Sequence, residues 1–117
     1  MNDNQRMALA EIGHPKHMDS LVHDRDWQVR IIVARNGDDS HRDKLINDRM
    51  SDVRRVVAIR GNDSHRDKLI NDKAQFVRDG VARAGNKEHA TKLLKDPDYT
   101  VMRTARQRLR ELGEKHE

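Results

Sequence analysis

A hydroxyl, an imidazole and a carboxylate lie within four residues of one another at Ser64, His65 and Asp67. These are the residue types of a nucleophile, a general base and its orienting acid, so the stretch suggests acyl-transfer chemistry. The same group occurs 24 positions earlier, because residues 37–48 and residues 61–72 differ at one of twelve positions. The fixed period assigns these side chains to a structural repeat and not to a catalytic triad.

Histidines at one repeat position form the most suggestive metal-binding set, which comprises His17, His41, His65 and His89. Neighbouring helices pack about 8–10 Å apart, whereas the ligands of one zinc ion lie about 2.0–2.1 Å from it. The four histidines therefore cannot share one ion. We expect each to pack at the start of a short helix, four residues before a buried Leu. His14 and His17 could chelate a metal weakly, and we predict no metal site.

Several classes of function lack the residues that they require. The absence of cysteine excludes disulfides, thiol catalysis and cysteine-ligated metal centres. No glycine-rich phosphate loop occurs, so we expect no enzymatic activity, no cofactor and no small-molecule substrate. Residues 1–10 are polar, and no run approaches the roughly 20 apolar residues of a membrane span. We therefore expect a cytoplasmic protein with no membrane partner.

The composition favours a stack of small units over a compact globule. Hydrophobic residues make up 34% of the chain and charged residues 38%, which suffices when each unit is buried only against its neighbours. The formal net charge is +4, yet residues 1–26 carry five acids and three bases. The excess positive charge therefore lies later, most densely in residues 103–110, and favours an acidic partner.

The elements that position these side chains follow a 24-residue register. The units are residues 3–26, 27–50, 51–74 and 75–98, followed by a capping helix at 99–117. The third, sixth and seventh positions of a unit are apolar, a spacing that predicts a helix and not a strand. We predict long helices near 4–11, 25–36, 49–60, 73–84 and 97–112, and short helices near 16–22, 40–46, 64–70 and 88–95.

Helix ends are marked by recurring residues. The glycine at the eleventh position fits a left-handed C-terminal residue. Ser40 and Ser64 read as N-caps of the short helices. Asp48 and its equivalents would cap the next long helix, and Pro97 would occupy a first helical position. A recurrent Ala at the eighth position predicts close helix approach.

The pattern Val-Arg-x-x-Val-Ala occurs at residues 29–34, 53–58 and 77–82, and Gly, Leu and Asp follow it. It resembles HEAT-like repeats, and its 24-residue length is most similar to the leucine-rich repeat variant family. The resemblance implies an all-α fold of about five repeats, each a long α-helix with a short α- or 3₁₀-helix, in one right-handed α-solenoid over residues 1–117. The family prototype holds an iron–sulfur centre through cysteines, which this chain lacks.

Two charged ladders accompany the repeat. The fourth position of each unit is Arg and the twenty-second is Asp, which gives Arg6, Arg30, Arg54 and Arg78 opposite Asp24, Asp48, Asp72 and Asp96. In HEAT-like repeats such residues usually pair within and between units. We therefore expect a structural role for both ladders.

The candidate partner-binding residues are outward-facing cations and one Trp, namely Trp27, Arg35, Arg42, Lys44, Arg55, Arg66, Lys68, Arg83, Lys92, Arg103, Arg106 and Arg110. Trp27 is a binding anchor if it is exposed, and otherwise packs against the first repeat. We predict a non-catalytic protein-binding module, an adaptor or inhibitor with an acidic partner. The alternative is nucleic-acid binding through the basic strip and the C-terminal Arg-rich helix.

Overall fold

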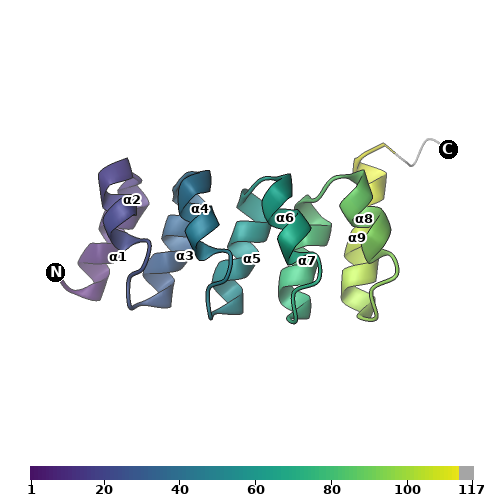
Figure 1. The fold of residues 1–117 in the computed structure, drawn as a ribbon, viewed down its shortest axis with the longest axis horizontal. Coiled ribbons are helices and arrows are strands. Elements are labelled where there is room, and N and C mark those ends of the chain that lie inside the picture. Colours follow the sequence, from purple (N-terminus) through teal and green to yellow (C-terminus); the bar gives the residue numbers. More distant parts are fainter. Residues whose placement is uncertain (114–117) are drawn as a thin grey trace.

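Helices account for all the regular secondary structure within residues 1–113, the part of the chain that this computed structural model describes (Figure 1). They are α1 (Asp3–Ile12), α2 (Pro15–Leu21), α3 (Trp27–Asn36), α4 (Asp39–Leu45), α5 (Ser51–Arg60), α6 (Asp63–Leu69), α7 (Gln75–Ala84), α8 (Lys87–Leu93) and α9 (Tyr99–Glu111). The expectation of an all-α fold is confirmed. Residues 114–117 of the expected capping helix lie outside the described residues.

Long and short helices alternate along an elongated row that measures 53 × 25 × 20 Å. Each long helix packs against the next long helix, and each short helix packs against the long helices before and after it. Figure 1 shows the pairs following one another from the N-terminal end to the C-terminal end. No described helix has the combined length and apolar character needed to cross a membrane.

A single line of aliphatic side chains forms the core. The third and seventh positions are fully buried, as expected, at Val29, Val33, Val53, Val57, Val77, Val81, Val101 and Ala105. The short helices add the buried leucines at Leu21, Leu45, Leu69 and Leu93. The recurrent alanines are also fully buried, at Ala10, Ala34, Ala58 and Ala82.

The first turns of the four later long helices were placed too early from the sequence. The carboxylate of Asp48 does not cap α5, since it accepts a hydrogen bond from the Met50 backbone N–H at 2.9 Å and pairs with Arg30. The helix therefore begins at Ser51. Pro97 likewise precedes the N-cap residue Asp98 and does not occupy a first helical position.

The three later short helices begin with a reciprocal pair of hydrogen bonds that the sequence interpretation missed. The N-caps are Asp38, Asn62 and Asn86, so the prediction of Ser40 and Ser64 as caps was wrong. The Asn62 side chain accepts from the His65 backbone N–H at 3.0 Å, and the His65 Nδ1 accepts from the Asn62 backbone N–H at 3.0 Å. This is a capping box in which His replaces the usual Glu. All four short helices are α-helical.

The glycines that end the long helices serve two different purposes. Gly13 has φ +78° and is left-handed, as predicted. Gly37, Gly61 and Gly85 have extended backbones instead, with φ near −75° in the first two. A Cβ on Gly61 would lie 2.5 Å from the Val57 carbonyl oxygen and 2.5 Å from His65 Nδ1. Close approach of the histidine ring therefore requires glycine there.

Candidate binding surfaces

The arginine and aspartate ladders form a buried, neutral strip. Arg54 Nε and Nη2 donate to the two carboxylate oxygens of Asp72 at 2.9 and 3.2 Å, and its Nη1 donates to the Asp48 carbonyl oxygen at 2.7 Å. The first pair lies within one repeat and the last bond joins two repeats. The same pattern recurs at Arg30 and Arg78, which confirms the predicted pairing. The hydrogen bond to Asp96 raises the pKa of Arg78 above its ordinary value.

The histidines at the fifteenth position join successive short helices. His65 Nε2 lies 2.6 Å from Asp43 Oδ1 in the preceding repeat. Because Nδ1 already accepts from a backbone N–H, the neutral ring must carry its proton on Nε2 and donate it to Asp43. His41 and His89 have equivalent contacts at 2.7 and 2.6 Å. The expectation that these histidines pack at the start of a short helix is confirmed.

The first repeat lacks this arrangement, because His14 stands where the later repeats have Asp or Asn. His14 caps α2 through Nδ1, which accepts from the Lys16 backbone N–H at 3.2 Å. His17 is half-buried, and its Nδ1 has no hydrogen-bond partner among the described residues. Residues 1–113 contain no cluster of three or more His, Cys, Asp or Glu suited to a metal ion.

Arg42 and Arg66 were expected to be free surface cations, but each caps the end of a long helix. Arg66 Nη1 donates to the Ala58 and Gly61 carbonyl oxygens at 3.1 and 2.9 Å, and its Nη2 pairs with Asp63 at 3.0 Å. Both arginine side chains are only 12% exposed. Their guanidinium groups are therefore occupied within the fold.

The fourth repeat has Ala90 in place of this arginine, and the last helix supplies a substitute. Arg108 of α9 donates from Nε to the Gly85 carbonyl oxygen at 2.8 Å and from Nη2 to the Ala84 carbonyl oxygen at 3.3 Å. The C-terminal end of α7 is thus capped by a residue from another helix. No feature of the repeat register points to this role.

Arg55 is also engaged between repeats. Its Nη1 donates to the Phe76 carbonyl oxygen at 2.7 Å and to Asp79 Oδ2 at 3.0 Å, and its guanidinium lies 4.2 Å from the centre of the Phe76 ring. Gly80 makes room for this side chain, since a Cβ there would lie 3.2 Å from Arg55 Cγ. Arg55 therefore fastens α5 to α7 instead of presenting a free charge.

Two further candidates on the long helices are partly covered. Trp27 is half-buried and packs against the core, so it is not a fully exposed anchor. Arg35 is half-buried, and its guanidinium pairs with Glu11 of the preceding repeat at 3.3 Å. Neither side chain is therefore a fully exposed contact for a partner.

A row of exposed cations occupies the ends of the short helices and the loops that connect each short helix to the next long helix. We call it the basic edge, formed by the eighteenth, twenty-first and twenty-third repeat positions at Arg25, Lys44, Arg49, Lys68, Lys73, Lys92 and Lys95. All seven side chains are exposed, and no Asp or Glu occupies these repeat positions. Only Arg25 and Lys92 have ion pairs within residues 1–113, each at 3.9 Å. Most cations of the edge therefore have no ion pair of their own among the described residues.

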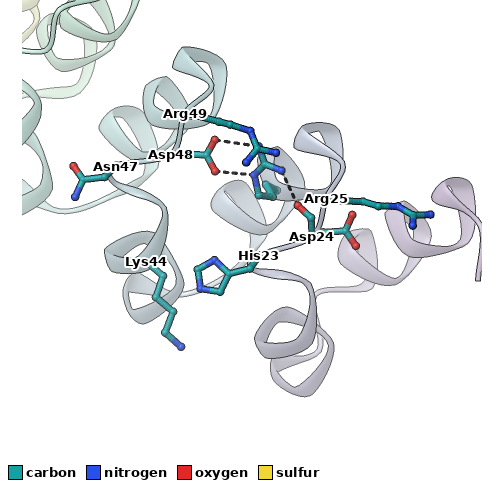
Figure 2. Close-up of a pocket in the computed structure, with 8 residues that line it drawn as sticks. His23, Asp24, Arg25, Lys44, Asn47, Asp48 and Arg49 are labelled. Carbon is teal, nitrogen blue, oxygen red and sulfur yellow. Dashed lines mark hydrogen bonds and ion pairs between the residues drawn. The ribbon is translucent and has the colours of Figure 1, made fainter.

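Hollows lie along this edge at the junctions between repeats. The first, of about 620 Å³, is lined by residues that include His23, Arg25, Lys44 and Arg49. In Figure 2 the side chains of Lys44 and Arg25 extend away from Asp48. Hollows of about 410 and 250 Å³ follow at the next two junctions. Asp24 and Asp48 also line the first hollow, but their carboxylates pair with Arg6 and Arg30, so the outward cations set its charge.

A second basic surface lies on α7 and α9. We call it the arginine hollow, a depression of about 460 Å³ lined by Arg83, Arg103, Thr104, Arg106, Gln107 and Arg110. The structure thus brings together four of the arginines selected from the sequence. Three of them, Arg103, Arg106 and Arg110, recur at helical spacing on one face of α9.

Sequence reasoning found Lys44, Lys68 and Lys92 but missed the other cations of the basic edge. Arg49 and Lys73 were assigned to the first turn of a long helix, where they would have been dispersed around its axis. The structure instead places them in the preceding loop. The available signal was the absence of acids at the twenty-first and twenty-third repeat positions.

No protein-family model matches the chain, and no curated protein shows recognisable sequence similarity to it.

Proposed function

We propose that this chain is a right-handed α-solenoid of about five 24-residue repeats that acts as a non-catalytic protein-binding module. Its basic edge would bind an extended, acidic segment of a partner protein, as an adaptor or inhibitor does. The observation that carries the proposal is the set of exposed cations that recurs in each repeat at positions where no repeat has an acid. Such a surface attracts an acidic partner and accelerates its encounter.

The spacing of the edge suits a polypeptide. Long helices in successive repeats pack against each other, and packed helices lie about 8–10 Å apart. A peptide in the polyproline II conformation advances about 3.1 Å per residue and has three residues per turn. Three peptide residues therefore span one repeat, and acids at every third position lie on one side of the peptide, where each would meet a cation from one unit.

The neighbouring surface disfavours a nucleic-acid duplex. Asp19, Asp43 and Asp67 stand on the short helices beside the basic edge, and their side chains are 69–71% exposed. A duplex is wide enough to approach these carboxylates, where its phosphates would be repelled. A narrow peptide can contact the edge alone. The edge therefore favours an acidic protein segment over a phosphodiester backbone.

Fluorescence anisotropy with a labelled peptide of about 15 residues, carrying Glu at every third position, tests the proposal. Lys44→Gln/Lys68→Gln should weaken binding about 2- to 30-fold, because exposed ion pairs contribute about 0.2–1 kcal/mol each. The matched control is Lys16→Gln/Arg60→Gln, which removes two exposed cations away from the edge. Equal losses in both variants would contradict the proposal.

The same measurement with a labelled DNA duplex of similar length tests the alternative of nucleic-acid binding. Affinity for the peptide should fall modestly between about 50 and 200 mM salt, whereas duplex binding should be weak at both concentrations. Tight duplex binding that is lost steeply with salt and with Lys44→Gln/Lys68→Gln would replace the proposal with nucleic-acid binding.

A further inference from the structure

We propose that the arginine hollow binds a phosphomonoester group, such as that of a phosphorylated Ser or Thr. The origin of this group on a partner protein rests on the function proposed above, whereas the site itself does not. The hollow is formed by Arg83 of α7 and by a face of α9, with a volume of about 460 Å³. This volume accommodates a phosphorylated side chain together with ordered water.

The guanidinium groups of the hollow have few partners of their own. Arg106 Nη2 lies 3.3 Å from the sulfur of Met102, and Arg110 Nη1 lies 3.5 Å from the side-chain oxygen of Gln107. Arg103 lies over the ring of Tyr99, 5.7 Å from its centre. None of these three arginines pairs with a carboxylate among residues 1–113. Their hydrogen-bond donors are therefore available to a ligand.

The one described carboxylate that contacts an arginine of the hollow is largely committed elsewhere. Asp79 lies 3.6 Å from Arg83 but accepts shorter bonds from Arg55 at 3.0 Å and from the Thr104 hydroxyl at 2.5 Å. It therefore offsets the charge of Arg83 only in part. The hollow retains an excess of positive charge that a strongly anionic group would balance.

A phosphomonoester matches this arrangement better than other anions. It carries about −1.5 to −2 charge at neutral pH and three strong acceptor oxygens, and arginine binds such oxygens through paired N–H groups. A carboxylate offers two oxygens and one charge. A phosphodiester backbone spreads its charges along a line, whereas these four arginines surround one depression.

The hollow is separate from the basic edge. Arg83 and Arg110 are each the residue before the last in α7 and α9, whereas the basic edge lies at the N-terminal ends of the long helices. Figure 1 shows these two ends of α9 on opposite sides of the row. A phosphorylated segment at the hollow and an acidic segment at the edge can therefore bind simultaneously.

The test uses the full chain with a labelled phosphoserine peptide, its Ser twin and its Glu twin. We expect the phosphopeptide to bind about tenfold more tightly than either twin. Against the Ser twin it gains charge-assisted hydrogen bonds, and against the Glu twin it gains a larger negative charge and a third acceptor oxygen. Arg106→Gln should abolish most of this preference, and Arg106→Lys should restore it only partly, since lysine lacks the paired donors. Arg60→Gln, another exposed arginine near a helix end, is the matched control.

The pH dependence separates a phosphoryl site from a general charge effect. The second phosphate pKa is about 6, so phosphopeptide affinity should rise between about pH 5 and 7 while Glu-peptide affinity stays level. Lys44→Gln/Lys68→Gln should leave the preference for the phosphopeptide over its twins intact. The acidic-peptide experiment therefore tests the basic edge, and the phosphopeptide preference tests the arginine hollow independently. Equal binding of all three peptides, or loss of the preference in Arg60→Gln, would overturn the inference. So would tight binding of duplex DNA through Arg106.

Discussion

At the scale of single residues, the cap of the short helix decides how each repeat is joined to the next. Asn62 accepts from the His65 backbone N–H at 3.0 Å, and its side-chain nitrogen donates to Asp39 of the preceding repeat at 3.1 Å. Ser64 is exposed and contributes no cap. The cap residue therefore performs a local and an inter-repeat task at once.

Asn62→Ala should destabilise the protein by about 1–2 kcal/mol, because an N-cap and a bond between repeats are lost together. Ser64→Ala should change stability by less than about 0.5 kcal/mol, as surface substitutions usually do. Urea unfolding followed by circular dichroism measures both. A larger loss in Ser64→Ala than in Asn62→Ala would restore the cap assignment made from the sequence.

The pKa of Asp63 is lowered from its ordinary value of 3.8, first by a hydrogen bond from Asn86 and then by one from Arg66. A carboxyl group whose pKa is lowered by folding contributes stability above its unfolded pKa, and this contribution is lost as pH falls through the folded pKa. Stability should therefore decline below about pH 4. In Asp63→Asn the loss of stability with falling pH should be smaller, because the titrating carboxyl group is gone. Thermal unfolding between about pH 2.5 and 6 compares the two slopes.

At the scale of helices, the arginine ladder joins the start of each long helix to the loops on both sides. Arg54 is 7% exposed and holds both Asp72 and the Asp48 carbonyl oxygen. Removing it would leave the Asp72 carboxylate buried without its cation. A buried pair broken on one side costs far more than an exposed pair.

Arg54→Ala should lower the free energy of unfolding by about 3–5 kcal/mol, whereas Arg60→Ala should change it by less than about 0.5 kcal/mol. Arg54→Ala/Asp72→Asn should recover part of the loss, because the uncompensated charge is gone. Urea unfolding gives the free energies. If Arg54→Ala also abolished peptide binding in its folded fraction, the ladder would belong to the binding surface as well.

The sequence predicted the helices better than their ends. Positions such as Val53 and Val57 could be assigned to the core because helical spacing alone determines which side chains share a face. The start of α5 could not, because Asp48 had to be allocated between a helix cap and Arg30. That choice depends on how the long helix of a repeat folds against the loop that ends the same repeat, which periodicity does not report.

The same distinction applies to the candidate site. Lys44 and Lys68 could be recognised as exposed because lysine side chains are almost never fully buried unless they are paired. Arg42 and Arg66 share those helices, but their long side chains fold back onto carbonyl oxygens of the preceding helix. The sequence could not predict that Arg83 and Arg106 line one hollow, because this depends on how α7 packs against α9.

At the scale of the whole molecule, nearly every contact is between a repeat and its neighbours. Stability of such arrays is approximately a sum over repeats and their interfaces. Inserting a second copy of residues 51–74 after Ala74 adds one repeat and one interface. His65 of the new copy would form a hydrogen bond with Asp67 of the original copy, as His89 does in the present chain.

The lengthened protein should therefore unfold at a higher temperature than the natural chain. Removal of residues 99–117 should lower the unfolding temperature, because it strips α9 from α7 and α8 and removes the Arg108 cap. Differential scanning calorimetry of the three lengths measures the trend. A lengthened chain with a lower unfolding temperature would contradict additivity between repeats.

The arginine ladder also has a mechanical consequence. Each paired aspartate binds the arginine of its own repeat through its carboxylate and, at Asp24, Asp48 and Asp72, the arginine of the next repeat through its carbonyl oxygen. An unbroken chain of hydrogen bonds thus runs from Arg6 to Asp96. When its termini are pulled apart, the molecule would first resist extension as a whole, and its repeats would then unfold one at a time. Each released unit of 24 residues would add up to about 80 Å of slack, which makes the array a stepwise extensible tether.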